Sequence, residues 1–127
     1  MRTGRPRSLP PLVDTESFTG MPVDDFDTAR AWYEIFAGRP PDRAPEPGEA
    51  AWRLAGTSWI AVVADAERAG SALLTMLVDD LERHVGFLAM RGIAPESVET
   101  VPGVVRKATI RDPAGNTITI EQSLATG

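Results

Sequence analysis

The residues best suited to acid or base chemistry lie near the C-terminus. Thr117, Thr119 and Glu121 are separated by single isoleucines, which is the pattern of a strand with one polar and one apolar face. The two hydroxyls and the carboxylate therefore share a face, where a partly buried Glu121 would be a candidate general acid or base. A solvated carboxylate at the end of the strand is the alternative interpretation.

The chain has one histidine and no cysteine. The lack of cysteine excludes disulfides, thiolate metal sites and cysteine nucleophiles. The histidine, His84, lies beside an apolar stripe of Leu81, Val85 and Leu88 at helical spacing. This pattern favours a role on the helix surface or in packing over that of a catalytic base.

A strand and a helix are predicted at the start of the first half. Residues 17–23 alternate in the manner of a strand, and Asp24 and Asp25 follow, where a side chain can cap a helix. Apolar residues then recur at helical spacing as far as Gly38, which suits a left-handed C-terminal cap.

A loop and a hairpin are expected next. Residues 40–48 are rich in proline and charge, which predicts a loop with at most a short edge strand. Residues 50–55 and 58–64 have strand character and are joined around Gly56 and Thr57, as in a tight hairpin.

The second half repeats the first. Residues 76–82, Met-Leu-Val-Asp-Asp-Leu-Glu, match residues 21–27, Met-Pro-Val-Asp-Asp-Phe-Asp, at an offset of 55. Residues 117–120 match residues 59–62 at an offset of 58. Repetition near half the chain length implies two copies of one supersecondary unit, with the order β-α-β-β-β.

The repeat predicts an α+β fold with both units in one domain. We expect the first unit at 15–66 and the second at 70–123. Two such units would pair into a curved mixed sheet around a cup, with the helices on the convex face. Residues 1–14 carry three arginines but no apolar core of a secretion signal, so we expect a disordered tail.

One face of the predicted sheet would line this cup. By strand parity the face is apolar and partly aromatic, with a few hydroxyls, which suits a planar or aromatic organic ligand. Phe18 and Leu73 serve equally well as core filling. Trp52 and Arg53 alternate, so only one of them reaches this face. The candidate ligand-binding residues are Phe18, Trp59, Ala61, Leu73, Thr75, Thr117, Thr119 and Arg53.

The last predicted hairpin carries the sequence Asp112-Pro113-Ala114-Gly115-Asn116. Asp, Pro and Gly occupy the first, second and fourth positions of a type I turn. Together with the repeat, this turn resembles the vicinal oxygen chelate superfamily, which includes glyoxalase I, the bleomycin-resistance proteins and extradiol dioxygenases. The resemblance extends from residue 17 to about residue 122 and implies paired βαβββ units.

The resemblance also indicates where a metal would be bound. Metal-dependent members hold a divalent ion with His or Glu from the first and last strand of each unit. The corresponding residues here are Phe18, Ala61, Leu73 and Thr119, and none is a usual ligand of such an ion. We therefore expect no metal and no cofactor.

A metal-free member of this superfamily would bind and sequester a small aromatic or cationic metabolite or antibiotic. In the bleomycin-resistance branch the ligand lies in grooves at a dimer interface, which implies a homodimer. The alternative is a metal-independent isomerase, cyclase or lyase of secondary metabolism with Glu121 as acid or base, so enzymatic activity stays open. A regulatory module whose tail contacts a partner is the third hypothesis.

Charge and hydropathy narrow the range of partners. The net charge of −5 disfavours binding to nucleic acid and favours a cationic ligand. No apolar run approaches the length of a membrane span, and we expect a cytoplasmic protein. Lys107 is the only lysine, and this arginine bias indicates a GC-rich bacterial genome.

Overall fold

The computed structural model describes residues 15–125 of the 127, so the predicted tail at 1–14 lies outside the described residues. Residues 15–125 adopt the α+β fold that the sequence predicts. The elements in chain order are β1 (Ser17–Val23), α1 (Phe26–Ala37), β2 (Glu49–Ala55), β3 (Ser58–Ala64), β4 (Leu73–Leu77), α2 (Leu81–Met90), β5 (Ser97–Val101), β6 (Val105–Arg111) and β7 (Thr117–Ser123).

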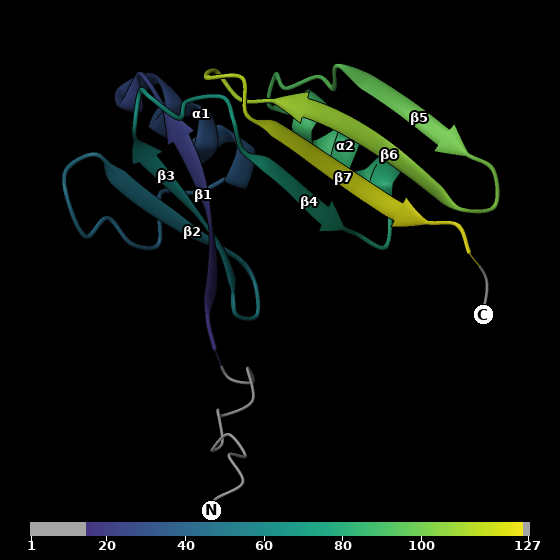
Figure 1. The fold of residues 1–127 in the computed structure, drawn as a ribbon. Helices are drawn as coiled ribbons and strands as arrows, with labels where there is room; N and C mark the ends of the chain where they lie inside the picture. Colours follow the sequence, from purple (N-terminus) through teal and green to yellow (C-terminus); the bar gives the residue numbers. More distant parts are fainter. Residues whose placement is uncertain (1–14, 126–127) are drawn as a thin grey trace, which may run out of the picture.

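The strands form two mixed sheets, with the orders β1-β3-β2 and β4-β7-β6-β5. In each sheet the first pair is parallel and the other pairs are antiparallel. The helices α1 and α2 lie behind the two sheets in Figure 1, so the opposite faces of both sheets point toward the viewer. The mixed sheet of the predicted fold is divided into two parts, and β1 and β4 are their edges, because no hydrogen-bonded ladder joins these strands among the described residues.

The register of the two sheets agrees with the sequence repeat residue by residue. Phe18 pairs with Trp59 in the first sheet, and Leu73 pairs with Thr117 in the second. These pairs differ by 55 on the edge strand and by 58 on its neighbour, as the repeat predicts. The two halves are therefore copies in three dimensions as well as in sequence.

One strand of the repeat is reduced to a single bridge in the first half. In the second sheet, Ser97 on β5 pairs with Thr109 on β6. The position equivalent to Thr109 is Ala51 on β2, and it forms an isolated bridge with Arg43. The proline-rich loop at 40–48 thus replaces β5, since proline cannot donate a backbone hydrogen bond to a ladder.

The second aspartate of each Asp-Asp pair is the N-cap of the helix that follows it. The carboxylate of Asp25 accepts a hydrogen bond from the backbone N–H of Thr28 at 3.1 Å, and Asp80 accepts one from Arg83 at 3.1 Å. The helix α1 ends at Gly38, whose φ of 76° gives the expected left-handed cap. Neither helix of the described chain is long and apolar enough to cross a membrane.

The core lies between each helix and the inner face of its sheet. Tyr33 of α1 and Trp52 of β2 are both fully buried, with ring centroids 5.9 Å apart. The indole N–H of Trp52 donates to the carbonyl of Arg39 at 2.9 Å. Because Trp52 occupies the inner face, the neighbouring Arg53 lies on the outer face of the sheet.

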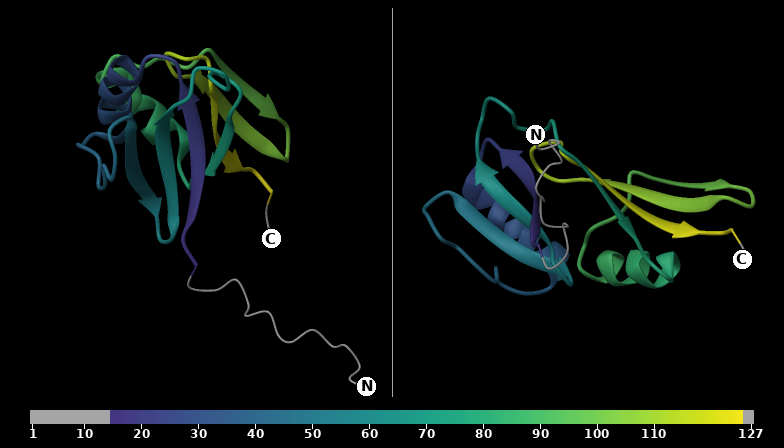
Figure 2. Two further views of the ribbon diagram at one scale, coloured as in Figure 1. Left: turned by 60° about the vertical axis from the view of Figure 1, so that its left-hand side comes forward. Right: turned by 60° about the horizontal axis from the view of Figure 1, so that its bottom comes forward.

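The turn that contains Asp112 joins the two units. Asp112 and Asn116 are buried, and the amide of Asn116 donates to the carbonyl of Pro22 in the first unit at 2.8 Å. The hydroxyl of Tyr33 donates to Asp112 Oδ2 at 2.7 Å. Burial, and then the nearby carboxylate, raise the pKa of Tyr33 well above its ordinary value. These hydrogen bonds fix how the units lie beside each other in Figure 2.

Candidate functional site

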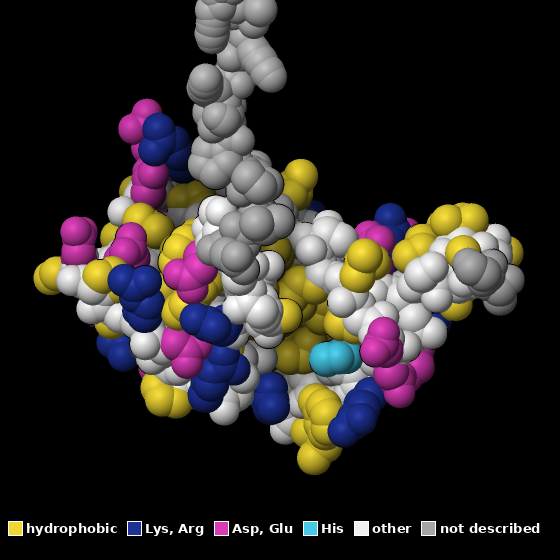
Figure 3. Space-filling view, turned by 90° about the horizontal axis from the view of Figure 1, so that it is seen from below, with side chains coloured by type: hydrophobic (Ala, Val, Ile, Leu, Met, Phe, Trp, Pro, Cys, Tyr) yellow, Lys and Arg dark blue, Asp and Glu magenta, His cyan; other side chains and the backbone are white. Residues whose placement is uncertain are grey.

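A groove with a volume of about 970 Å³ separates the two units. Figure 3 looks into this hollow, where apolar side chains form the floor and charged side chains lie around the mouth. Residues of both units line it, including those at the ends of α1 and β1, the β2–β3 hairpin, β4 and α2. The volume suits a small organic molecule.

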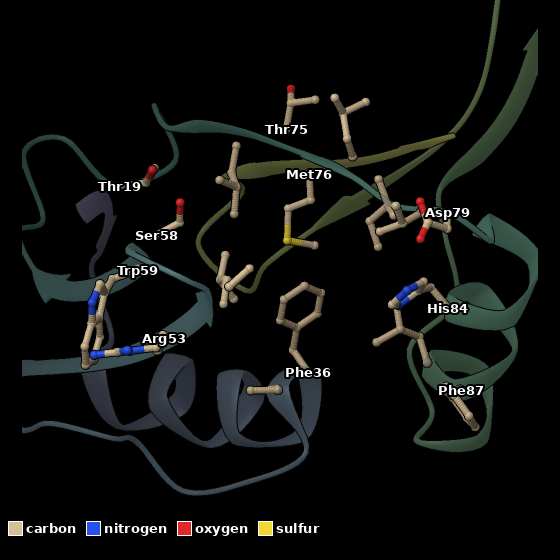
Figure 4. Close-up of a pocket in the computed structure, with 18 of the residues that line it drawn as sticks. Thr19, Phe36, Arg53, Ser58, Trp59, Thr75, Met76, Asp79, His84 and Phe87 are labelled. Carbon is tan, nitrogen blue, oxygen red and sulfur yellow. The ribbon is translucent and has the colours of Figure 1, made fainter. Parts of the chain in front are cut away.

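The first unit contributes the end of α1 and the hairpin between β2 and β3. Phe36 projects from α1 toward the middle of the groove (Figure 4). Trp59 of β3 stacks on Phe18, with centroids 5.3 Å apart, and the guanidinium of Arg53 lies 5.0 Å from the Trp59 ring centroid. The indole N–H donates to Glu16 at 3.0 Å, so the polar edge of this side chain is satisfied.

The second unit contributes β4 and one side of α2. Met76 points from β4 toward the space in front of Phe36 (Figure 4). His84, Leu88 and Arg91 line the same groove at the i, i+4 and i+7 spacing of one helix face. The structure therefore places His84 in the wall of a cavity, although the sequence pattern alone favoured a role on the helix surface or in packing.

The arginines at the mouth differ in their partners. Arg39 pairs with Asp42 at 2.9 Å, and this hydrogen bond lowers the pKa of Asp42. Arg53 pairs with Glu16 at 3.2 Å. Arg91 instead donates to the backbone carbonyl of Phe36 at 3.2 Å, which links the ends of the two helices.

Three of the predicted ligand-binding residues line the groove: Arg53, Trp59 and Thr75. The other five are on the faces of the two sheets but are not part of the groove lining. They are Phe18, Ala61, Leu73, Thr117 and Thr119, with Phe18 and Ala61 in the first sheet and the remainder in the second.

Glu121, the predicted acid or base, also lies outside the groove lining. It is partly buried on β7, in register with Leu77 on one side and Lys107 on the other. The structure thus brings it close to β4 but does not place it with His84. A catalytic role for Glu121 stays a prediction of the sequence.

The positions where the resemblance would place metal ligands carry no suitable set of donor atoms. An aromatic ring, two aliphatic side chains and one hydroxyl do not fit a divalent ion, which needs several nitrogen or oxygen ligands. These residues are Phe18, Ala61, Leu73 and Thr119. Within residues 15–125, no three His, Asp or Glu side chains lie close enough to hold a metal ion.

The sequence analysis missed most of the groove. Phe36 and Met76 fit the helix and strand patterns of a single unit, and no sequence pattern singles out Arg91 by itself. The available signal was the stripe of His84, Leu88 and Arg91 on α2, which mixes polar and apolar residues on one face. That mixture is typical of a helix beside a cavity.

Comparisons with known proteins agree with this fold. A glyoxalase/bleomycin resistance protein from Catenulispora acidiphila is 34% identical over 85% of this chain and 97% of its own, with a TM-score of 0.81. An antibiotic binding protein from a Streptomyces species is 21% identical over 87% and 97%, with a TM-score of 0.69. A lactoylglutathione lyase from Agrobacterium tumefaciens is 21% identical over 86% and 93%, with a TM-score of 0.65.

The fold and the repeated units define a member of the vicinal oxygen chelate superfamily. Within it, the identity to the Catenulispora protein shows that this chain belongs to the glyoxalase/bleomycin resistance protein family. No family model and no curated protein sequence matches the chain.

Proposed function

We propose that this protein binds and sequesters a small organic metabolite or antibiotic in the groove between its two units. The groove itself carries the proposal, because about 970 Å³ of space with an apolar floor and a few polar groups is typical of a ligand site. An antibiotic binding protein of the same fold supports an antibiotic as one class of ligand. An aromatic ligand suits the apolar side chains of Phe36, Leu54 and Met76 in the lining.

We also propose that the protein acts as a homodimer. Leu73 and Leu77 of β4 are 78% and 75% exposed, which is unusual for leucines in a strand. The edges of β1 and β4 occupy equivalent places in the two units, and neither pairs with another strand on its outer side within the described chain. Two copies of the chain can offer each other the same pair of edges.

Catalysis by Glu121 is the alternative function, but no feature of the groove favours it. The carboxylate is not part of the lining and forms no hydrogen bond or ion pair among the described residues. A tail-mediated regulatory role falls on residues outside the described part of the chain. A cytoplasmic location and a bacterial source stay predictions of the sequence.

Binding in the groove can be tested with N-phenyl-1-naphthylamine, a neutral aromatic probe whose fluorescence rises in apolar sites. We expect saturable binding at one probe per groove. Met76→Gln places an amide in the groove and should weaken binding by about tenfold, because a buried amide without a partner loses at least about 1 kcal/mol.

Met90→Gln is the matched control, since Met90 lies on the same unit but is 84% exposed and is not part of the groove lining. This variant should bind the probe as the parent protein does. Circular dichroism would establish that both variants are folded. Equal binding by both variants would show that the groove is not the site, and a lack of saturable binding would contradict the proposed function.

A further inference from the structure

The charges in the groove point to the class of ligand, on the premise that the proposed function is correct. We infer that the groove binds a planar organic anion, such as an aromatic carboxylate or sulfonate. Its anionic group would lie against α2, with its ring over the apolar floor.

Most basic side chains of the described chain already have an acidic partner. Seven of the ten arginine and lysine residues between 15 and 125 form ion pairs with carboxylates. The three that form none are Arg43, Arg83 and Arg91, and the last two both line the groove. Two guanidinium groups therefore face the same cavity without an acid to neutralise them.

The guanidinium of Arg91 is held in place by the first unit. It donates to the carbonyl of Phe36 at 3.2 Å and lies against Gly38, where an added Cβ would come within 2.9 Å of Arg91 Nη2. One N–H group is used in this contact and the others have no partner among the described residues. A fixed guanidinium binds an anion without the entropic penalty of ordering a long side chain.

Arg83 and His84 line the same side of the groove along α2. The guanidinium of Arg83 lies 5.5 Å from the ring centroid of Phe87, and Figure 4 shows the ring of His84 pointing into the groove. Both side chains are exposed and can donate to a ligand. An anion bound between Arg83 and Arg91 would therefore meet donors along one helix face.

Arginines outnumber carboxylates in the groove lining. Among the described residues, four arginines line it, Arg39, Arg53, Arg83 and Arg91, against two aspartates, Asp79 and Asp80. Both aspartates precede the first turn of α2, whereas Arg91 follows its last turn. The net charge of −5 led us to expect a cationic ligand. Because salt screens charges more than about 8–10 Å away, the groups beside the ligand decide its sign, and here they favour an anion.

The apolar floor of the groove would contact the planar part of the ligand. Phe36, Leu54 and Met76 present apolar side chains between the two walls. Aromatic rings stack well on such a surface, and the arginines remain at its edge.

The inference can be tested with two probes that differ by one charge. Anilinonaphthalene sulfonate and N-phenyl-1-naphthylamine share the same ring system, but only the first carries a sulfonate. We expect the anionic probe to bind more tightly and its affinity to fall with added salt. Arg83→Gln should weaken the anionic probe about threefold to tenfold and weaken the neutral probe less, since it removes one charge-assisted contact.

Arg68→Gln is the control, because Arg68 is exposed, pairs with Asp65 and does not line the groove. It changes the net charge by the same amount and should leave both affinities unchanged. A double change of Arg83 and Arg91 to glutamine should weaken the anionic probe further than Arg83→Gln alone.

The outcomes separate this inference from the proposed function. If the two probes bind equally well, or if Arg68→Gln weakens the anionic probe as much as Arg83→Gln does, the preference for anions is wrong although the groove still binds ligands. If neither probe binds in a saturable way, the proposed function fails as well. Weaker binding of both probes to the Met76→Gln variant would locate them in the groove.

Discussion

The two units follow one plan but cover their apolar residues to different degrees. The first unit has the fully buried Tyr33 and Trp52 in its core, and on its outer face Trp59 is only 5% exposed beneath Phe18 and Arg53. Its aromatic residues therefore bury one another within a single chain.

The second unit has an aliphatic core and leaves more apolar surface uncovered. Two of the nine large apolar side chains that the described chain exposes belong to the first unit, Phe18 and Ile35. The other seven belong to the second unit and are Leu73, Leu77, Phe87, Met90, Val98, Val101 and Val104. The two units thus share a fold, while the second unit exposes an apolar surface that a partner or ligand can cover.

The largest expected effect concerns the core of the first unit. Trp52→Ala should lower the free energy of unfolding by about 3–5 kcal/mol, because it removes a fully buried indole and leaves a cavity. Met90→Ala in the second unit should change it by less than about 0.5 kcal/mol, since the side chain is exposed. Chemical denaturation measures both. A similar loss in the two variants would remove the difference that we draw between the units.

The next effect concerns the uncovered face of the second unit. Leu73→Lys should raise the dissociation constant of the homodimer by more than about tenfold, because a leucine buried at an interface contributes about 1.5–3 kcal/mol. Met90→Lys, which adds the same charge on α2, is the control. Sedimentation velocity over a range of concentrations would follow both. A parent protein that stays monomeric at all concentrations would contradict the proposed dimer.

A smaller effect is expected at the contact between the units. Tyr33→Phe should lower the free energy of unfolding by about 1–2 kcal/mol, because Asp112 loses one hydrogen bond but keeps that from Asn116. The groove should also bind the neutral probe less tightly if this contact fixes the angle between the units. A variant as stable as the parent would show that the hydrogen bond does not join the units.

The same tyrosine predicts how stability depends on alkaline pH. Folding raises the pKa of Tyr33, so its contribution is fully present below about pH 10, the ordinary value for tyrosine, and is lost as the pH rises further. Tyr33→Phe should lack this loss. Because Tyr33 is the only tyrosine, its absorbance also reports ionisation directly. Ionisation near pH 10 in the folded protein would contradict the burial of this hydroxyl.

The sequence predicted the repeated unit because its signals are local. Alternation in strands, the Asp-Asp pair before each helix and the turn at Asp112 each depend on neighbouring residues. The offsets of 55 and 58 recur in the register of both sheets, because equivalent residues pair in the two copies. The outward placement of Phe18 and Leu73 follows from the alternation in their strands.

The groove depended on contacts between residues far apart in the chain. The hydrogen bond from Tyr33 to Asp112 joins residues that are 79 positions apart in the chain, and it holds the two units together. The angle between the two units decides whether His84 faces solvent or a cavity and whether β1 and β4 pair. No local sequence pattern determines either of these features. The sequence by itself therefore determined the two units and their inner and outer faces. The tertiary structure decided the space between them, because only the packing of the units brings the ends of α1, α2 and the β2–β3 hairpin together.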